Sequence, residues 1–293
     1  MNSALQCLMR LPGLNEVLDL PPAYAIENTP AQVFFKEYDD LRRMALDNEN
    51  CTISPALFRH AVQLYAKHKK NSDFAGANQN DAAEFIQFVL HGIHEALARK
   101  EDFDSVPVDN DLEKKCLEMM KLNFSKEFSD VVHLFYGIQL SYIKENVTPE
   151  AFLTLNLPIP PAAKTLLECF EAYFADETIE GWQNEKTGKE ETVTKTLRLF
   201  RLPAVLFLCL KRFSANGRKN DQYIEIPTQF EINNDMFVLQ CGCYHQGNLN
   251  SGHYTATVNI SGKWVVIDDD ASFPATNLSK NAYCLFYVRK GLE

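Results

Sequence analysis

A histidine and three aspartates near the end of the chain have the spacing of a catalytic base with a carboxylate partner. The sequence HYTATVNI, which begins at His253, is followed by the turn residues Ser261 and Gly262 and then by WVVIDDD, which ends at Asp270. Two runs rich in β-branched and aromatic residues around such a turn are typical of a β-hairpin. Residues 253–270 are therefore predicted to pair as two antiparallel strands.

The register of this hairpin decides which carboxylate reaches the histidine. A two-residue turn places His253 opposite Asp270 and diagonal to Asp268, and both positions are within side-chain reach. Asp269 is expected on the other face of the hairpin. A carboxylate that holds a histidine fixes its tautomer and stabilises the imidazolium, which is the orienting half of a nucleophilic triad. A surface hairpin with a solvated acidic end is the alternative interpretation.

The first half of the chain shows helical periodicity. Leu5, Leu8 and Met9 indicate a helix that Pro12 is expected to end. The most regular pattern is predicted to form a helix with Asp81 at its start and basic residues at its end. An acidic, turn-rich connection is expected next, then one or two helices up to about Phe128. The ranges expected to be helical are 31–47, 54–67 and 81–100, and the connection covers 101–112.

The second half shows the pattern of strands. From Val131 onward, short runs rich in β-branched and aromatic residues alternate with turn residues. The polar segment 176–195 is expected to be an exposed excursion. Because helices come first and strands second, the predicted fold class is α+β with an antiparallel sheet, in contrast to an alternating parallel fold.

Composition excludes some classes of function. The chain has 293 residues, of which 46% are hydrophobic, and a formal net charge of -10. Nucleic-acid binding needs a basic surface, so it is not expected, and no apolar run reaches the roughly 18 residues of a membrane span. The eight cysteines are scattered without the spacing of a disulfide framework. This pattern favours a reducing compartment, the cytosol or the nucleus.

Several segments, in the same order along the chain, resemble the motifs of the ubiquitin-specific proteases. HQGNLNSGHY, WVVIDDD and AYCLFYV resemble the histidine box of that family, and QNDAAEF resembles its Q-x-D-A-x-E-F helix. NSALQCL, from Asn2 to Leu8, matches the end of the family's cysteine box, N-x-G-N-T-C-Y-M-N-S-x-L-Q. LPAVLFLCLKRF, and LFYG followed by FLTLNLPIP, are similar to further motifs, so the resemblance covers nearly the whole chain.

This resemblance implies one catalytic domain over residues 1–293 with a papain-like cysteine peptidase fold. A helical thumb would cover 1–128, and an antiparallel β palm with β fingers would cover 129–293, with the fingers around 138–200. The implied activity is hydrolysis of the bond after the ubiquitin C-terminus. The implied partners are ubiquitin and ubiquitinated proteins, and no cofactor is implied.

The resemblance also implies roles for single residues. His253 would be the base, and Asp268 would orient it, with Asp269 or Asp270 in reserve. Asp81 would help to hold the basic, glycine-ended tail of ubiquitin. As the N-cap of its helix it has a second use, which does not exclude the first. The other expected contacts with the tail come from Gln79, Gly252 and Tyr254.

The nucleophile is missing from this pattern. In the family's cysteine box the catalytic cysteine stands two residues before the methionine that matches Met1. We therefore expect a chain cut within that box and nearly inactive. A catalytically dead ubiquitin-binding scaffold, an enzyme for a ubiquitin-like modifier, and a helix that begins here with a Ser3–Gln6 capping box are the alternatives. Cys7 is expected to be a buried inert thiol, and the remaining isolated cysteines are expected in apolar surroundings: Cys51, Cys116, Cys169, Cys209 and Cys284.

No metal site is expected. The family commonly carries two C-x-x-C pairs that bind zinc, but SYIKENVTPE and GWQNEKTGKE stand at those places and contain no cysteine. The fingers would then be held by packing alone. Cys241, Cys243 and His245 alternate along one strand and could hold a soft metal. The inward side of a buried strand is the more ordinary interpretation of the same pattern.

Overall fold

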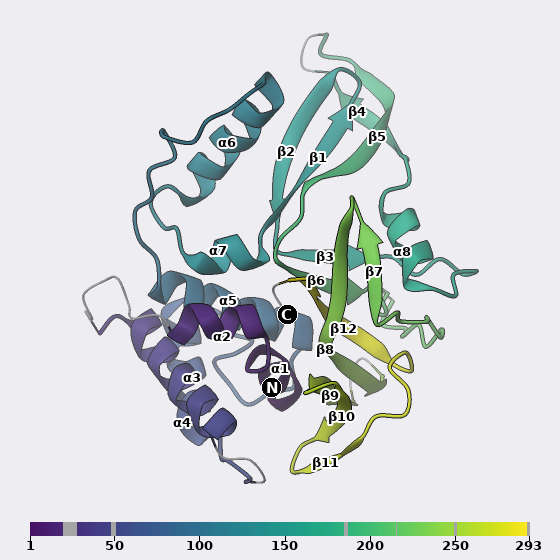
Figure 1. Cartoon of the computed structure of the whole chain (residues 1–293). Coiled ribbons are helices and arrows are strands. Elements are labelled where there is room, and N and C mark those ends of the chain that lie inside the picture. The colour runs from purple at the N-terminus through teal and green to yellow at the C-terminus, as the bar shows by residue number, and fades with distance from the viewer. Residues whose placement is uncertain (20–27, 48–50, 185–186, 215, 249–250, 292–293) are drawn as a thin grey trace.

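Helices occupy the chain up to Phe135, as Figure 1 shows. The structure is a computed structural model that describes residues 1–293 apart from 20–27, 48–50, 185–186, 215, 249–250 and 292–293. These helices are α1 (Asn2–Leu8), α2 (Pro12–Asp19), α3 (Pro30–Asp47), α4 (Ala56–His68), α5 (Ala82–Ala96), α6 (Asp111–Phe124) and α7 (Asp130–Phe135). None of the helices among the described residues is long and apolar enough to cross a membrane.

Strands dominate the remainder of the chain and form two sheets. One sheet has eight strands in the order β11-β10-β9-β8-β12-β6-β3, with β7 also paired to β8; the other has four in the order β2-β1-β5-β4. Every pairing is antiparallel except that of β3 with β6. The expected α+β class is confirmed. The elements are β1 (Gly137–Ile143), β2 (Asn146–Phe152), β3 (Thr154–Leu157), α8 (Leu166–Tyr173), β4 (Glu177–Gln183), β5 (Glu190–Arg201), β6 (Val205–Leu210), β7 (Gln229–Ile232), β8 (Asp235–Gly247), β9 (Gly252–Ile260), β10 (Lys263–Asp268), β11 (Ala271–Pro274) and β12 (Ala282–Arg289).

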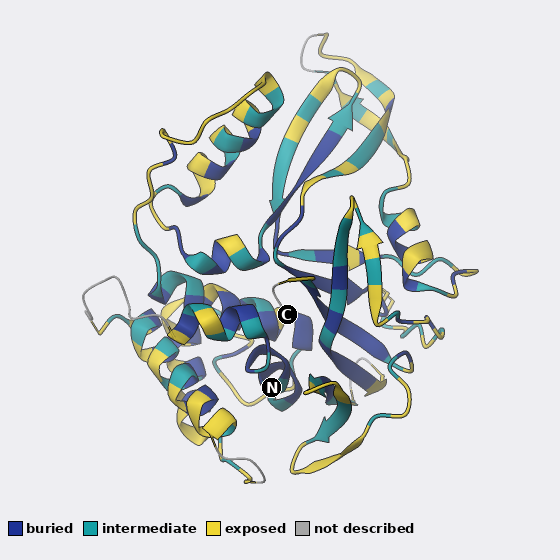
Figure 2. Ribbon diagram, viewed as in Figure 1, coloured by how far each residue is buried: buried dark blue, intermediate teal, exposed yellow. Residues whose placement is uncertain are grey.

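The eight-stranded sheet is covered on both faces, and its central strands are consequently apolar on both sides. All of β6 and nearly all of β12 is buried (Figure 2). Phe207 and Phe286 stack with their ring centroids 4.7 Å apart, in the cluster that also contains the apolar side chains of α1, α3 and α5. The other face packs against α8 through a second cluster that includes Leu208 and Leu285. Continuous apolar runs are what a doubly covered strand requires.

Helix α5 is the centre of the helical half because α1, α3 and α7 all pack against it. Its face packs against α3 and α4, where Phe34, Tyr65 and Phe88 make a cluster of ring contacts between 4.9 and 6.0 Å. Gly92 lets α3 approach closely, since a Cβ atom added there would lie 2.5 Å from Cε1 of Phe34. A glycine in the middle of a helix is normally unfavourable, so close packing accounts for it here.

The helix ends differ from the sequence prediction in two places. Pro12 was expected to end the first helix, but α1 already ends at Leu8. Pro12 instead begins α2, where its fixed φ and missing N–H suit a first helical position. The helix expected over 81–100 stops at Ala96. Arg99, expected to complement the helix dipole, instead forms an ion pair with Asp130 at 2.9 Å and pairs with Phe128 through its backbone.

Two segments of the second half also differ from the prediction. Strands were expected from Val131, but residues 130–135 form α7, with Val131, Val132 and Phe135 buried. The polar segment 176–195 is mostly exposed, as expected, but it contains β4 and much of β5, which pair as a hairpin. Alternating or polar patterns do not reveal such short elements by themselves. The division into thumb, palm and fingers stays a prediction.

The packing of Gly92 yields a prediction about stability. Alanine is favoured over glycine in a helix by about 1 kcal/mol, but overpacking a core costs about 1–3 kcal/mol. Because the new contact with Phe34 would be only 2.5 Å long, we place the overpacking cost in the upper half of its range. We therefore expect Gly92→Ala to lower the free energy of unfolding by about 1–2 kcal/mol in urea denaturation. Gly76→Ala is the control, because a Cβ atom there meets nothing within 4 Å. An unchanged or raised stability of Gly92→Ala would contradict the packing argument.

Candidate active site

The hairpin of β9 and β10 has the register predicted from its two-residue turn. Lys263 pairs with Ile260, and the ladder continues in step to Ile267 and Ala256. Ser261 and Gly262 both have positive φ, at 50° and 81°. Two consecutive left-handed residues are the mark of the turn type that joins strands without splaying them. The turn therefore fixes which residues at the far end of the hairpin face each other.

His253 and Asp268 meet at that far end. Nε2 of His253 and Oδ1 of Asp268 are 2.5 Å apart, and the two side chains are 51% and 39% exposed. This is the diagonal contact that the register predicted. The carboxylate holds a proton on Nε2, so Nδ1 is left as the nitrogen that can take up or release a proton. The pair has the arrangement of a base with its orienting acid.

The other two aspartates do not lie where the sequence placed them. Strand β10 ends at Asp268, and Asp269 adopts a left-handed φ of 51°, so Asp270 never comes opposite His253. The expectation that Asp269 faces away is also wrong. Its carboxylate lies within 4.8 Å of the ligand atoms of His253 and Asp268. The turn at Asp269 breaks the alternation of faces on which both expectations depended.

Asp269 also connects the hairpin to the start of α1. Its backbone oxygen accepts a hydrogen bond from Nδ2 of Asn2 at 3.2 Å. Helix α1 begins at Asn2 without a side-chain cap, so the alternative of a Ser3–Gln6 capping box is not formed. Among the described residues, His253, Asp268 and Asp269 are the one cluster of three potential metal ligands. A metal ion there would compete with the bond between His253 and Asp268.

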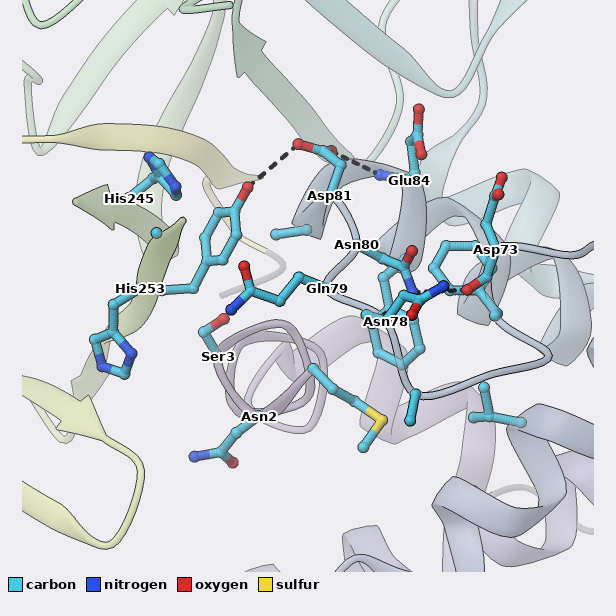
Figure 3. A pocket seen from close by; sticks show the side chains of 18 of the residues that line it. Asn2, Ser3, Asp73, Asn78, Gln79, Asn80, Asp81, Glu84, His245 and His253 are labelled. Atoms are coloured by element: carbon cyan, nitrogen blue, oxygen red, sulfur yellow. Dashed lines mark hydrogen bonds between the residues drawn. The ribbon is translucent and has the colours of Figure 1, made fainter. Parts of the chain in front are cut away.

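A cavity of about 680 Å³ opens beside His253, between the start of α1, the segment before α5 and strand β9. All four residues expected to contact the substrate line it together with the histidine. Figure 3 shows Gln79 between the start of α1 and the strand that carries His253. The structure thus brings Gln79, Asp81, Gly252 and Tyr254 to one surface.

Asp81 lies at the inner wall of this cavity, with both oxygens in use. Oδ1 accepts hydrogen bonds from the backbone N–H groups of Ala83 and Glu84, which makes Asp81 the N-cap of α5. Oδ2 accepts from the hydroxyls of Tyr283 at 2.6 Å and Tyr254 at 3.2 Å. Burial raises the pKa of both phenols, so they stay protonated and donate. Tyr283 was not found from the sequence, because nothing distinguishes it from the apolar strand around it.

The cavity is acidic. Asp73, Asp81 and Glu84 line it, against one basic side chain, Arg59, among the described lining residues. Burial, and then repulsion from Asp81 and Asp73, raise the pKa of Glu84. Carboxylates in a concave site concentrate negative potential and attract a basic ligand.

His245 forms part of the cavity wall and is buried, with 3% exposure. Its ring packs against Tyr254 at 4.6 Å and Phe213 at 5.2 Å. Cys241 and Cys243 instead contact helix α1. The Sγ atom of Cys243 lies 3.7 Å from that of Cys7, and Cys241 donates to the backbone oxygen of Cys7. Among the described residues, these two cysteines therefore do not form a metal cluster with His245.

The thiols lie in the core, with one exception. Cys7 is buried as expected, and burial raises its pKa well above the ordinary value. The hydrogen bond between Cys243 and Cys7, followed by burial, does the same for Cys243. Cys51 was expected in apolar surroundings but is exposed. The remaining cysteines are buried: Cys116, Cys169, Cys209, Cys241 and Cys284.

Comparison with solved structures supports the fold. The chain superposes on a subunit of the SAGA Ubp8/Sgf11/Sus1/Sgf73 DUB module bound to ubiquitin aldehyde with a TM-score of 0.74 and 26% identity, covering 100% of this chain and 68% of that one. A second structure of that module gives 0.71 and 27%, with 100% and 66% covered. The α+β fold implied by the resemblance is confirmed.

Comparison with known sequences gives the family. Ubiquitin carboxyl-terminal hydrolase Usp2 of Drosophila melanogaster is 28% identical over 319 residues, which cover 99% of this chain and 34% of that protein. Ubiquitin carboxyl-terminal hydrolase 4 of Eremothecium gossypii is 27% identical over 301 residues, with 84% and 34% covered. The chain thus spans about a third of the length of these relatives. The model of the family described as ubiquitin carboxyl-terminal hydrolase matches residues 1–287, and the chain therefore belongs to that family.

Proposed function

We propose that the chain is the catalytic-type domain of a deubiquitinase, a thiol hydrolase for the bond after the ubiquitin C-terminus. The observation that carries the proposal is the hydrogen-bonded pair of His253 and Asp268 at the mouth of an acidic cavity. The family relationship supports it, as does the ubiquitin aldehyde bound by the similar module. The eight free cysteines favour a reducing compartment, the cytosol or the nucleus.

In this proposal each residue has a defined task. Nδ1 of His253 takes the proton of a thiol, the thiolate attacks the carbonyl carbon, and the proton passes to the leaving amine. Water then hydrolyses the thioester. Asp268 holds the imidazole in place through Nε2. Gln79, Asp81 and the cavity-facing residues of β9, Gly252 and Tyr254, hold the substrate tail.

We further propose that none of the eight cysteines of this chain is the nucleophile. A nucleophilic thiol must form thiolate, and burial opposes that in Cys7 and Cys243, which also contact each other. Cys51, the exposed cysteine, does not line the cavity. Loss of one member of a catalytic unit typically reduces turnover about a million-fold. The burial of the thiols thus also favours a second candidate, a ubiquitin-binding scaffold without catalysis.

The first test uses ubiquitin with a thiol-reactive group at its C-terminus. We expect the chain to bind it, measured by calorimetry, and to form no covalent adduct, measured by intact mass. Iodoacetamide is the control, because it should alkylate the exposed Cys51 before the buried cysteines. An adduct mapped to any cysteine would refute the assignment of the thiols. If the chain binds a ubiquitin-like modifier and does not bind ubiquitin, the proposed substrate is wrong and the modifier takes its place.

The second test supplies the thiol. A variant extended by Asn-Thr-Cys-Tyr before Met1 places a cysteine where the family's box has it. We expect this variant to hydrolyse a fluorogenic amide of ubiquitin, and the same extension with serine in place of cysteine to be the inactive control. His253→Ala should abolish the activity, and Asp268→Asn should lower it by about 10⁴ because the tautomer is no longer fixed. Activity that survives His253→Ala would rule out the proposed base.

The third test concerns the acidic cavity. Asp81→Asn keeps an oxygen for the N-cap but removes the charge and the second oxygen, which accepts from Tyr254 and Tyr283. We expect the affinity for ubiquitin to fall roughly tenfold or more. Added salt should weaken binding by the wild-type chain more than by this variant. Asp40→Asn is the matched control, since Asp40 lies on α3 in an exposed ion pair with Lys36. Equal affinities of Asp81→Asn and the wild type would leave Asp81 with a structural role alone.

A further inference from the structure

We propose that His245 is a positioning residue for His253. It sets the place of His253 by packing against Gly252 and Tyr254, the residues before and after it. His245 and His253 lie on neighbouring strands, β8 and β9, where His245 pairs with Tyr254. The inference rests on the proposed function only in treating His253 as the base. The contacts of His245 itself are independent of that function.

The first contact is with Gly252. A Cβ atom built on Gly252 would lie 2.0 Å from Nε2 and 2.8 Å from Cε1 of His245. Real Cβ atoms do not approach other atoms so closely, so the imidazole fills the space that any side chain at 252 would need. The ring of His245 therefore lies directly against the main chain of the residue before His253.

The second contact is with Tyr254. The rings of His245 and Tyr254 have centroids 4.6 Å apart and planes inclined by 56°. Tyr254 is held at its other end by its hydrogen bond to Asp81. Alternate residues of a strand point to the same side, so Gly252 and Tyr254 both meet His245 while His253 projects the other way, toward Asp268. One buried ring thus supports both neighbours of the base.

His245 is itself rigidly held, which a positioning residue requires. Its backbone oxygen accepts a hydrogen bond from Nζ of Lys219 at 2.9 Å, and its N–H donates to Asn281 at 3.0 Å. Phe213 packs edge-on against the ring at 5.2 Å. Lys219 is 4% exposed at its side chain and is paired with Asp221. The backbone of His245 is thus held by two hydrogen bonds, and its ring is held by the packing of Phe213.

The ring works by its shape and not by its charge. Burial, and then the neighbouring Lys219, lower the pKa of His245, while Asp81 and Asp221 act in the opposite direction. Nδ1 is buried and has no hydrogen-bond partner within the part of the chain that the structure describes. A neutral ring with an unpaired nitrogen does not act as an ion-pair or proton-transfer group. The contacts of His245 with Gly252 and Tyr254 instead indicate that its ring acts as a spacer between strands.

The experiment is a double-mutant cycle of Gly252→Ala and His245→Ala in the chain as it stands. The first measurement is the melting temperature. The second is the NMR signal of the imidazole N–H of His253, which reports its hydrogen bond to Asp268 and which a purely packing role for His245 would leave unmoved. Gly252→Ala should lose or shift that signal and lower the melting temperature. His245→Ala removes the ring contacts at 2.0 and 2.8 Å and leaves the contact of the new methyl group with the backbone oxygen of Gln246 at 2.9 Å. The double variant should therefore regain both in part.

Gly92→Ala is the matched control for this cycle. Its added Cβ atom meets Phe34 at 2.5 Å, a clash of similar severity that lies in the helical half. It should lower the melting temperature without moving the His253 signal, and His245→Ala should not rescue it. Additive losses in the Gly252 and His245 double variant, or an unmoved His253 signal in Gly252→Ala, would overturn the proposal. Neither result depends on ubiquitin binding, so the proposed function is tested separately.

Discussion

The carboxylate of Asp81 joins the two halves of the molecule. One oxygen accepts from the first N–H groups of α5, and the other accepts from tyrosines on β9 and β12. Removing a carboxylate from water is costly unless its oxygens are paired, and for the partly buried Asp81 the helix start and the two phenols provide the pairing. The N-terminus of α5 and the strand that carries His253 are thereby fixed relative to each other. The cavity between them has its shape because of this one group.

This arrangement explains why two interpretations of Asp81 are compatible. The sequence offered an N-cap and a contact for a basic tail, and the structure shows the N-cap directly. Hydrogen bonds to Asp81 do not remove its charge, so it still adds to the negative potential of the cavity beside Asp73 and Glu84. The same carboxylate can therefore organise the wall of a site and attract what enters it.

The sequence predicted the centre of the candidate site better than its borders. A two-residue turn sets the register of a hairpin by counting alone, so the contact of His253 with Asp268 followed from local rules. Asp269 escaped the same reasoning because a left-handed residue ended the strand there. The roles of Arg99 and Pro12 were also not predicted. Arg99 is placed by its ion pair with Asp130, and Pro12 begins a second helix, and hydrophobic periodicity reports neither.

One physical rule accounts for the different surroundings of the cysteine thiols and of the imidazole of His253. Thiolate is stabilised by solvent and positive potential and is destabilised in an apolar core, so the cysteines that pack α1 against β8 gain stability for the fold and lose reactivity. The imidazole of His253 has the opposite surroundings, half exposed at a cavity mouth and held by a carboxylate. Packing therefore separates the sulfur from the base although both lie near α1. A buried thiol cannot serve that base without the unpacking of the helix that holds the hairpin end through Asn2.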